Sequence, residues 1–336
     1  MASGTTRGTT HLHFDSHTFD PRPRYPLVAT AKRYWHPDFY SEDADALTLI
    51  FAHGTGFHKE HWEPTLEYVY ETLARTGGVK LREAWSIDCP NHGDAAVINE
   101  EELQWGYEDL FAWEEYARSL HDFLTGQGTG IPVDFSTRRL VGIGHSMGAL
   151  SLMLAGMHQP KLTFSALILV DPMIFFKPPS REDAAMTVDL AGGAPKGEIS
   201  GPVERKPLNH FNLDLHSKSG IPGFLRSLLS QEAACYRDGL GYSRGYKLLK
   251  YLCQIVPVHF IYGAVDDYLP GFVKEDVLEN ACDGKYASVA RVPDAGHLVP
   301  QMQPRGLADA IFVILELESN RTSTPLQQQQ PYQSRL

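Results

Sequence analysis

One serine in this sequence stands in a setting that directly suggests chemistry. Ser146 is the centre of the pentapeptide Gly-His-Ser-Met-Gly, which follows an apolar run and precedes a small, apolar stretch suited to a helix. This order is typical of a strained strand-to-helix turn that exposes a serine hydroxyl above a sheet. Such a hydroxyl attacks a carbonyl carbon when a neighbouring base takes its proton. The pattern therefore predicts that Ser146 is a nucleophile.

A serine nucleophile needs a base and an acid that orients the base. His297 follows the last predicted strand, where this arrangement requires its histidine, so it is the predicted base. Two aspartates are candidates for the acid: Asp171 ends the strand after the serine, and Asp266 lies in a Gly-x-x-Asp turn after the penultimate strand. Both keep the chain order serine, aspartate, histidine, so the residues alone leave this choice open.

Backbone N–H groups are expected to stabilise the oxyanion of the intermediate. One predicted donor is Met147, directly after the nucleophile, and the other is Thr55, in the His-Gly-Thr loop after the first parallel strand. His53 and His145 lie on these same two segments. We expect their side chains to make local hydrogen bonds rather than to transfer protons.

Alternating strand and helix patterns must position these residues. Predicted strands cover residues 46–52, 82–88, 139–145, 164–170, 257–262 and 286–292, and helices are predicted over residues 61–75, 108–126, 147–158 and 304–318. This alternation predicts an α/β protein with a mainly parallel sheet, flanking helices and right-handed crossovers. Opening antiparallel strands are expected within residues 11–36.

The alternation breaks in the second half of the chain, where Pro- and Gly-rich loops predict an inserted lid. The predicted organisation has five parts: an N-terminal extension (1–25), the first part of the core (26–174), the lid (175–250), the second part of the core (251–318) and a disordered tail (319–336).

Composition limits the class of protein and its partners. The 336 residues are 43% hydrophobic and carry a formal net charge of −11, which argues against nucleic acid and anionic membranes as main partners. No apolar run is long enough for a transmembrane segment. The four cysteines lack metal-finger and redox-pair spacing, so we expect free thiols in a reducing compartment.

The last three residues, Ser334, Arg335 and Leu336, are a variant of the Ser-Lys-Leu signal that the peroxisomal import receptor reads. They follow a polar tail with four successive glutamines, which we expect to be disordered and accessible. The sequence therefore predicts the peroxisomal matrix as the location and the import receptor as a partner.

Taken together, the motifs resemble the α/β-hydrolase family over residues of about 26–318. The resemblance rests on the turns at 53–55 and 88–93, the Gly-x-Ser-x-Gly pentapeptide at 144–148, and the turns that carry Asp266 and His297. Three features resemble a narrower group, the fungal peroxisomal serine hydrolases: residues 52–60, residues 171–173 and the Ser-Arg-Leu end. That group includes an acyl-CoA hydrolase of mycophenolic-acid biosynthesis, AK-toxin pathway hydrolases and a yeast peroxisomal lipase.

The resemblance implies an α/β-hydrolase fold and the hydrolysis of an acyl ester or acyl-CoA thioester through an acyl-enzyme, with no cofactor and no metal. In the narrower group the acid can follow the strand after the nucleophile, which favours Asp171 over Asp266. Two alternatives stay open. One is a lipase or carboxylesterase that acts on a neutral lipid or a secondary-metabolite ester, and the other is a non-catalytic ligand-binding relative.

A small-molecule acyl substrate suggests further site residues. Because coenzyme A carries phosphates, an acidic protein that binds it needs a local group of cations. Lys59 follows the oxyanion loop, and Lys177 and Arg181 open the lid, so these three are the predicted cations. Phe175 and Phe176, at the start of the lid, are the predicted acyl-pocket residues.

Overall fold

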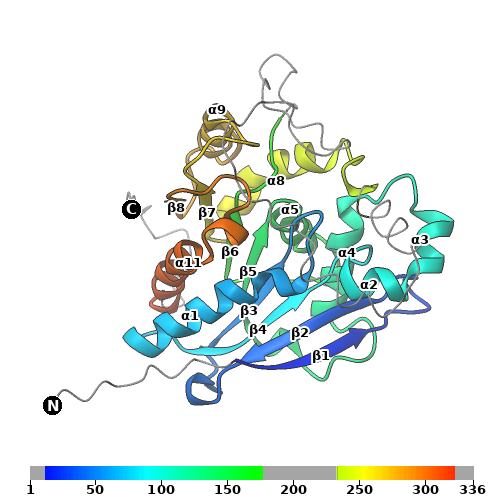
Figure 1. Cartoon of the computed structure of the whole chain (residues 1–336), viewed down its shortest axis with the longest axis horizontal. Coiled ribbons are helices and arrows are strands. Elements are labelled where there is room, and N and C mark those ends of the chain that lie inside the picture. Colours follow the sequence, from blue (N-terminus) through cyan, green and yellow to red (C-terminus); the bar gives the residue numbers. More distant parts are fainter. Residues whose placement is uncertain (1–11, 177–231, 233, 322–336) are drawn as a thin grey trace, which may run out of the picture.

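The computed structural model describes residues 12–176, 232 and 234–321, and its centre is an eight-stranded sheet (Figure 1). The strands are arranged in the order β1-β2-β4-β3-β5-β6-β7-β8. Their bounds are β1 His13–Phe19, β2 Ala29–Trp35, β3 Leu47–Ala52, β4 Leu81–Ile87, β5 Arg139–His145, β6 Ala166–Val170, β7 Val258–Gly263 and β8 Ser288–Val292.

The sheet is parallel from β4 to β8, while β1 and β2 join it as antiparallel strands. All residues of β3, β6 and β7 are buried, as expected for parallel strands that are covered on both faces. Parallel order places the carboxyl ends of β3 to β8 at one edge, which is where ligands bind in open α/β sheets.

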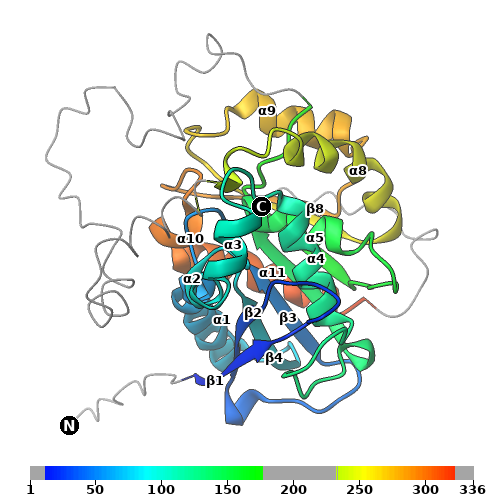
Figure 2. The same ribbon diagram turned by 90° about the vertical axis from the view of Figure 1, so that its right-hand side faces the viewer.

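Helices cover both faces of the sheet (Figures 1 and 2). Helices α1 (Glu63–Thr76) and α11 (Pro304–Ser319) pack on one face, over a core that contains Leu49 and Phe51 of β3. Helices α4 (Trp113–Leu124), α5 (Met147–Ala155) and α8 (Gly241–Ile255) pack on the other face, over a core that contains Ile50 and Ala52. Successive side chains of β3 thus enter opposite cores, as the two-residue period of a strand requires.

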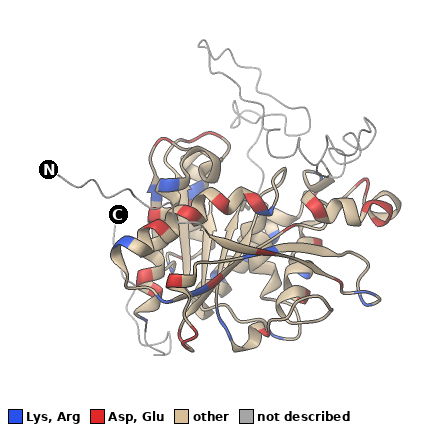
Figure 3. Cartoon of the chain, turned by 60° about the horizontal axis from the view of Figure 1, so that its bottom comes forward, with Lys and Arg blue, Asp and Glu red and all other residues tan. Residues whose placement is uncertain are grey.

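Shorter elements connect these layers. They are the 3₁₀ helices η1 Pro37–Phe39, η2 Lys59–Trp62 and η3 Phe135–Thr137, the helices α2 Gly93–Ile98, α3 Glu100–Gly106, α9 Gly271–Asp276 and α10 Val299–Met302, and the π-helical turn η4 Val277–Ala281. Figure 3 shows acidic residues on many separate helices and loops, with basic residues between them. None of the described helices is long and apolar enough to cross a membrane.

The predicted α/β-hydrolase architecture is confirmed, and the strand after η3 is predicted to the residue. Helix boundaries differ more: the helix expected over 61–75 begins at Glu63, because Lys59–Trp62 forms a 3₁₀ turn first. Strand β1 pairs with β2 along its whole length, so part of the expected N-terminal extension belongs to the sheet. Most of the predicted lid lies outside the described residues, and its expected end at residue 250 falls inside α8, which packs on the core.

Candidate active site

Ser146 occupies the turn between β5 and α5 with φ 54° and ψ −117°, a conformation that few non-glycine residues adopt. The turn is this tight because the chain on both sides of it is crowded. A Cβ on Gly144 would lie 2.5 Å from the backbone of Ala149, and a Cβ on Gly148 would lie 2.3 Å from the carbonyl oxygen of Ala52. The backbone N–H of Ser146 donates to the carbonyl of Val170, which ties the turn to the end of β6.

Three side chains from the carboxyl ends of different strands meet at this turn. Nε2 of His297, in the loop after β8, lies 3.0 Å from Oγ of Ser146. Nδ1 of His297 lies 2.7 Å from Oδ2 of Asp171, which follows β6. Because a carboxylate only accepts hydrogen bonds, Nδ1 carries the proton and Nε2 is left as the acceptor for the serine hydroxyl. This arrangement can transfer the serine proton to His297 while Asp171 stabilises the imidazolium that forms.

Asp171 is completely buried, with φ 41°, and also accepts the N–H of Gly263 at 3.3 Å. Burial alone would raise the pKa of Asp171, but the hydrogen bond and charge of His297 outweigh it, so the pKa is lowered. Asp171 is thus held as a carboxylate next to His297.

The alternative acid, Asp266, has a lysine as its partner in the structure. Its carboxylate pairs with Nζ of Lys274 at 2.9 Å, and this buried ammonium also donates to the carbonyls of Gly263 and Val265. The side chain of Asp266 is 48% exposed, in contrast to the buried Asp171. The geometry therefore agrees with the sequence-based preference for Asp171.

The backbone of His297 has two partners that the sequence analysis did not assign. Its N–H donates to both carboxylate oxygens of Asp267, and its carbonyl accepts Nε2–H of His145 at 2.8 Å. Asp267 directly follows Asp266, and no signal in the sequence indicates which of the two neighbours would reach this loop. Local hydrogen bonding was expected for His53 and His145: Nδ1 of His53 does lie 2.8 Å from the carbonyl oxygen of Gly54, whereas the partner of His145 is 152 residues away in the chain.

The predicted oxyanion residues lie next to each other. Oγ1 of Thr55 lies 3.3 Å from Sδ of Met147, and a Cβ on Gly54 would come within 3.1 Å of Cβ of Ser146. Met147 begins α5, so its N–H belongs to the first-turn amides that have no acceptor within the helix. Both expected donors therefore lie on segments that contact the nucleophile turn, and their role as an oxyanion hole stays a prediction.

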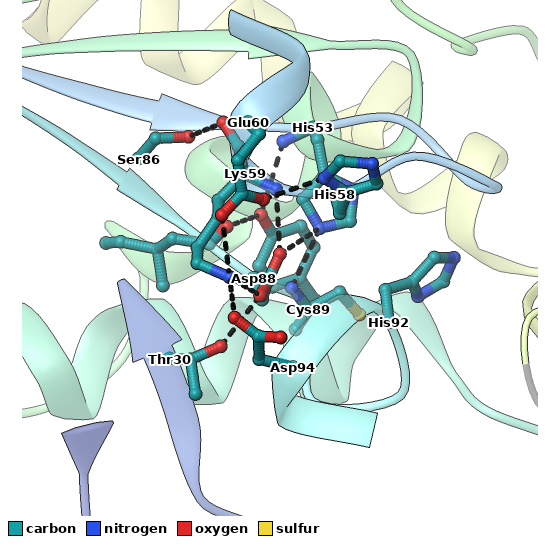
Figure 4. Close-up of polar contacts among 12 residues, drawn as sticks. Thr30, His53, His58, Lys59, Glu60, Ser86, Asp88, Cys89, His92 and Asp94 are labelled. Atoms are coloured by element: carbon teal, nitrogen blue, oxygen red, sulfur yellow. Dashed lines mark hydrogen bonds and ion pairs between the residues drawn. The ribbon is translucent and has the colours of Figure 1, made fainter. Parts of the chain in front are cut away.

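The prediction of a phosphate-binding cation requires Lys59 to lie free at the mouth of the site, but its side chain is buried. It is 2% exposed, and its Nζ pairs with Asp88 at 2.8 Å and with Asp94 at 2.7 Å (Figure 4). Burial would lower its pKa, but the charges of Asp88 and Glu60 outweigh burial and raise the pKa of Lys59. Because its charge is already neutralised inside the protein, these contacts argue against the expected role of Lys59 in binding phosphate, which stays a prediction.

The remaining predicted substrate residues divide into two groups. Phe175 is buried and stacks on Tyr242 with ring centroids 4.3 Å apart, whereas Phe176 is 65% exposed and meets Tyr246 edge-on. Their role in acyl binding stays a prediction. The other predicted residues, Lys177, Arg181, Ser334, Arg335 and Leu336, lie outside the described residues.

One group of described side chains has the composition of a metal site. Cys89, His92 and Cys235 are buried, and their donor atoms lie within 4.8 Å of one another. Nε2 of His92 accepts the N–H of Gly56 at 3.0 Å, however, and its Nδ1 lies 2.7 Å from Oδ1 of Asn91. A neutral imidazole that accepts at Nε2 carries its proton on Nδ1, so neither nitrogen is free for a metal. That the protein needs no metal or cofactor stays a prediction.

A serine on a strand-to-helix turn of a mainly parallel sheet, with a histidine and an aspartate at neighbouring strand ends, defines the class of α/β hydrolases. A sequence profile described as "Alpha/beta hydrolase family" matches residues 49–310 of this chain. The chain therefore belongs to the alpha/beta hydrolase family.

Individual relatives extend the comparison. The chain is 36% identical to the type I acyl-CoA thioesterase mpaH of Penicillium roqueforti over 138 residues, and 34% identical to the peroxisomal membrane protein LPX1 of Saccharomyces cerevisiae over 160 residues. These matches cover 41% and 45% of this chain but only 29% and 39% of the two relatives.

Solved structures resemble the fold over a larger part of the chain. The peroxisomal alpha-beta-hydrolase Lpx1 of Saccharomyces cerevisiae superposes with a TM-score of 0.62 at 20% identity, covering 94% of this chain and 92% of that chain. A thermophilic esterase of Thermogutta terrifontis gives a TM-score of 0.56 at 17% identity, covering 92% and 100%. At these identities the similarity establishes the fold alone.

Proposed function

We propose that this protein is a peroxisomal serine hydrolase that cleaves an acyl-CoA thioester or an acyl ester through Ser146, His297 and Asp171. The observation that carries the proposal is the pair of contacts on one imidazole: 3.0 Å from Nε2 to the serine oxygen and 2.7 Å from Nδ1 to the carboxylate. Hydrogen-bonded contacts of this length are those required for general-base activation of a serine.

The chemistry proceeds in two halves. Oγ of Ser146 attacks the acyl carbonyl carbon as His297 takes its proton, and the tetrahedral oxyanion is stabilised by the N–H groups of Met147 and Thr55. Its collapse breaks the bond to the thiol or alcohol, which leaves with the proton from His297. His297 then takes a proton from a water molecule, whose oxygen attacks the acyl carbon. The second collapse breaks the bond to Oγ of Ser146, which takes the proton back from His297, and the acid is released.

Two of the relatives support the finer parts of the proposal. A Penicillium relative is named as an acyl-CoA thioesterase, and a yeast relative is named as peroxisomal. The predicted Ser-Arg-Leu signal agrees with that location. Confocal imaging of a protein tagged at its N-terminus, with and without residues 334–336, tests the address: punctate signal that survives the deletion contradicts it.

A neutral ester is the second candidate for the substrate, and the position of Lys59 favours it. Lys59, one of the three cations expected to bind coenzyme A, already forms ion pairs with Asp88 and Asp94, so only Lys177 and Arg181 are left for that role. If those two bind phosphates, Lys177→Glu with Arg181→Glu raises KM for an acyl-CoA but not for a neutral ester of the same acyl chain. Equal effects on both substrates, or no effect on either, favour the neutral ester.

The mechanism is tested with Ser146→Ala and a fluorophosphonate probe, using acyl-CoA and p-nitrophenyl ester substrates. The parent is expected to label and to turn over at least one substrate, while Ser146→Ala does neither but keeps the parent's melting temperature. Turnover by Ser146→Ala within tenfold of the parent would contradict the proposal. A parent that neither labels nor turns over any substrate would favour a ligand-binding role.

A further inference from the structure

Both backbone polar groups of His297, its N–H and its carbonyl, are hydrogen-bonded to side chains. We propose that His145 and Asp267 are positioning residues, which bind the carbonyl and the N–H of His297 and thereby orient its imidazole toward Ser146. This inference rests on the proposed function, since it concerns the residue assigned there as the base.

His145 is a hydrogen-bond donor with a fixed proton position. Its Nε2 lies 2.8 Å from the carbonyl oxygen of His297, which only accepts, so Nε2 carries the proton. Burial, together with the nearby His297, lowers the pKa of His145 to about 3, so the imidazole stays neutral over the working pH range. A neutral ring with its proton on Nε2 binds this carbonyl without placing a second positive charge beside the base.

The ring of His145 is also confined by its neighbours. It packs between the rings of His297 and His61, with centroids 5.1 Å and 5.6 Å away, and Phe57 lies 6.0 Å away. A Cβ on Gly54 would lie 2.8 Å from Nδ1 of His145, so the oxyanion loop closes over this edge of the ring. Because His145 directly precedes Ser146, one rigid side chain connects the nucleophile turn, the oxyanion loop and the base.

Asp267 binds the other backbone polar group of His297, its N–H. Its two carboxylate oxygens accept the N–H of His297 at 2.8 Å and 3.0 Å, and Oδ1 also accepts the N–H of Tyr268 at 2.6 Å. The carboxylate occupies the place of a side chain at Gly296, where a Cβ would come within 1.9 Å of Oδ2. The contact therefore depends on a glycine directly before the histidine.

These contacts fix the position of the His297 imidazole, on which the rate of proton transfer depends. Asp171 holds the imidazole of His297, His145 holds its carbonyl and Asp267 holds its N–H, so the base is attached at three points. A misplacement of a reacting group by about 1 Å can cost about 100-fold in rate. Loss of either backbone contact should therefore lower kcat while leaving substrate binding almost unchanged.

The first test compares two substitutions of His145. His145→Phe keeps a ring but removes the donor, and we expect kcat to fall about 10- to 100-fold with KM within about twofold. His145→Gln keeps an N–H donor near the position of Nε2 and should recover most of kcat. His13→Phe is the control, because His13 is exposed on the edge strand β1, four strands away from β5, and it should behave like the parent.

The second test removes the contact to the N–H of His297. Asp267→Ala removes the acceptor and Gly296→Ala displaces it, so both should lower kcat about as much as His145→Phe, whereas Asp267→Asn keeps an oxygen acceptor and should lose less. These variants decide the question if His145→Phe does not fold.

Two results would overturn the inference. One is a kcat within twofold of the parent for folded His145→Phe and Asp267→Ala. The other is a loss of kcat that does not depend on the hydrogen bond: His145→Gln loses as much as His145→Phe, and Asp267→Asn loses as much as Asp267→Ala. That result would indicate packing rather than hydrogen bonding. Ser146→Ala in the same assay separates this inference from the proposed function. Turnover retained by Ser146→Ala refutes the proposed function. An inactive Ser146→Ala beside fully active His145 and Asp267 variants refutes only this inference.

Discussion

The carboxyl ends of β6 and β7 both carry an aspartate, and the two side chains have opposite surroundings. Asp171, after β6, is fully buried and binds Nδ1 of His297 at 2.7 Å. Asp266, after β7, is 48% exposed and binds Nζ of Lys274 at 2.9 Å. Two aspartates at equivalent strand ends therefore differ because they contact different basic residues. The partner of Asp171 is a histidine, which makes it a candidate triad acid, whereas the partner of Asp266 is a lysine, and the two form an ion pair that stabilises a loop.

The end of β4 extends the comparison to a third aspartate. Asp88 is as buried as Asp171, but its carboxylate accepts the backbone N–H and the ammonium of Lys59 and the hydroxyl of Thr30 (Figure 4). An ammonium neutralises this carboxylate permanently, whereas an imidazole can gain and lose a proton near neutral pH. Burial of an aspartate at a strand end therefore does not by itself identify an acid for catalysis.

The largest expected effect comes from removing the negative charge of Asp171 at the end of β6. Asp171→Asn removes the carboxylate that fixes the proton of His297, so kcat should fall by up to about 10⁴. Asp266→Asn is the matched control and should lose far less, because its carboxylate binds Lys274 instead. Steady-state kinetics of both purified variants provide the measurement, and a large loss confined to Asp266→Asn would reverse the assignment.

A second prediction concerns stability at the end of β4. Lys59→Met leaves Asp88 buried without its cation, and the free energy of unfolding should fall by about 3–5 kcal/mol. Lys80→Met is the control, since Lys80 is an exposed lysine that also pairs with aspartates, and its free energy of unfolding should hardly change. Urea denaturation measures both. A stable Lys59→Met protein with a raised KM for acyl-CoA would restore Lys59 as a substrate-binding residue.

A smaller loss is expected at the end of β7. Lys274→Met removes the donor to the carbonyls of Gly263 and Val265, which should cost about 1–3 kcal/mol of stability. The loss should be smaller than for Lys59→Met because the carboxylate left behind, Asp266, is half-exposed to water. If thermal and urea denaturation show Lys274→Met to be the more damaging of the two, exposure of the remaining partner does not set the cost.

The smallest expected effect is a dependence of stability on pH. The pKa of Asp171 is lowered by folding, so its contribution is fully present above its ordinary pKa of 3.8 and is lost as the pH falls through the lower pKa of the folded state. Between pH 5 and pH 3 the parent should therefore lose more stability than Asp171→Asn does. Denaturant titrations at the two pH values give the difference, and identical losses would mean that folding does not shift this group.

Local patterns were enough to predict much of the sheet and two of the three meeting side chains. The strand over 139–145 was predicted to the residue because a buried parallel strand is a continuous apolar run that ends in a glycine-rich turn. Ser146 and His297 were selected by their positions after predicted strands, and the structure brings their side chains together. Helices α5 and α11 begin at the predicted residues 147 and 304, whereas the helices predicted from 61 and 108 begin later, at Glu63 and Trp113, the first of them because the 3₁₀ turn Lys59–Trp62 precedes it.

The sequence by itself determined the fold class and the nucleophile turn, because both depend on periodicity and on residues close together in the chain. Only the tertiary structure decided which aspartate meets His297, that Lys59 is buried beside Asp88, and that Asp267 and His145 hold the backbone of the histidine. Those contacts join residues 29 to 152 positions apart. Their partners depend on strand order and loop direction, and neighbouring residues such as Asp266 and Asp267 are equivalent until the chain is folded.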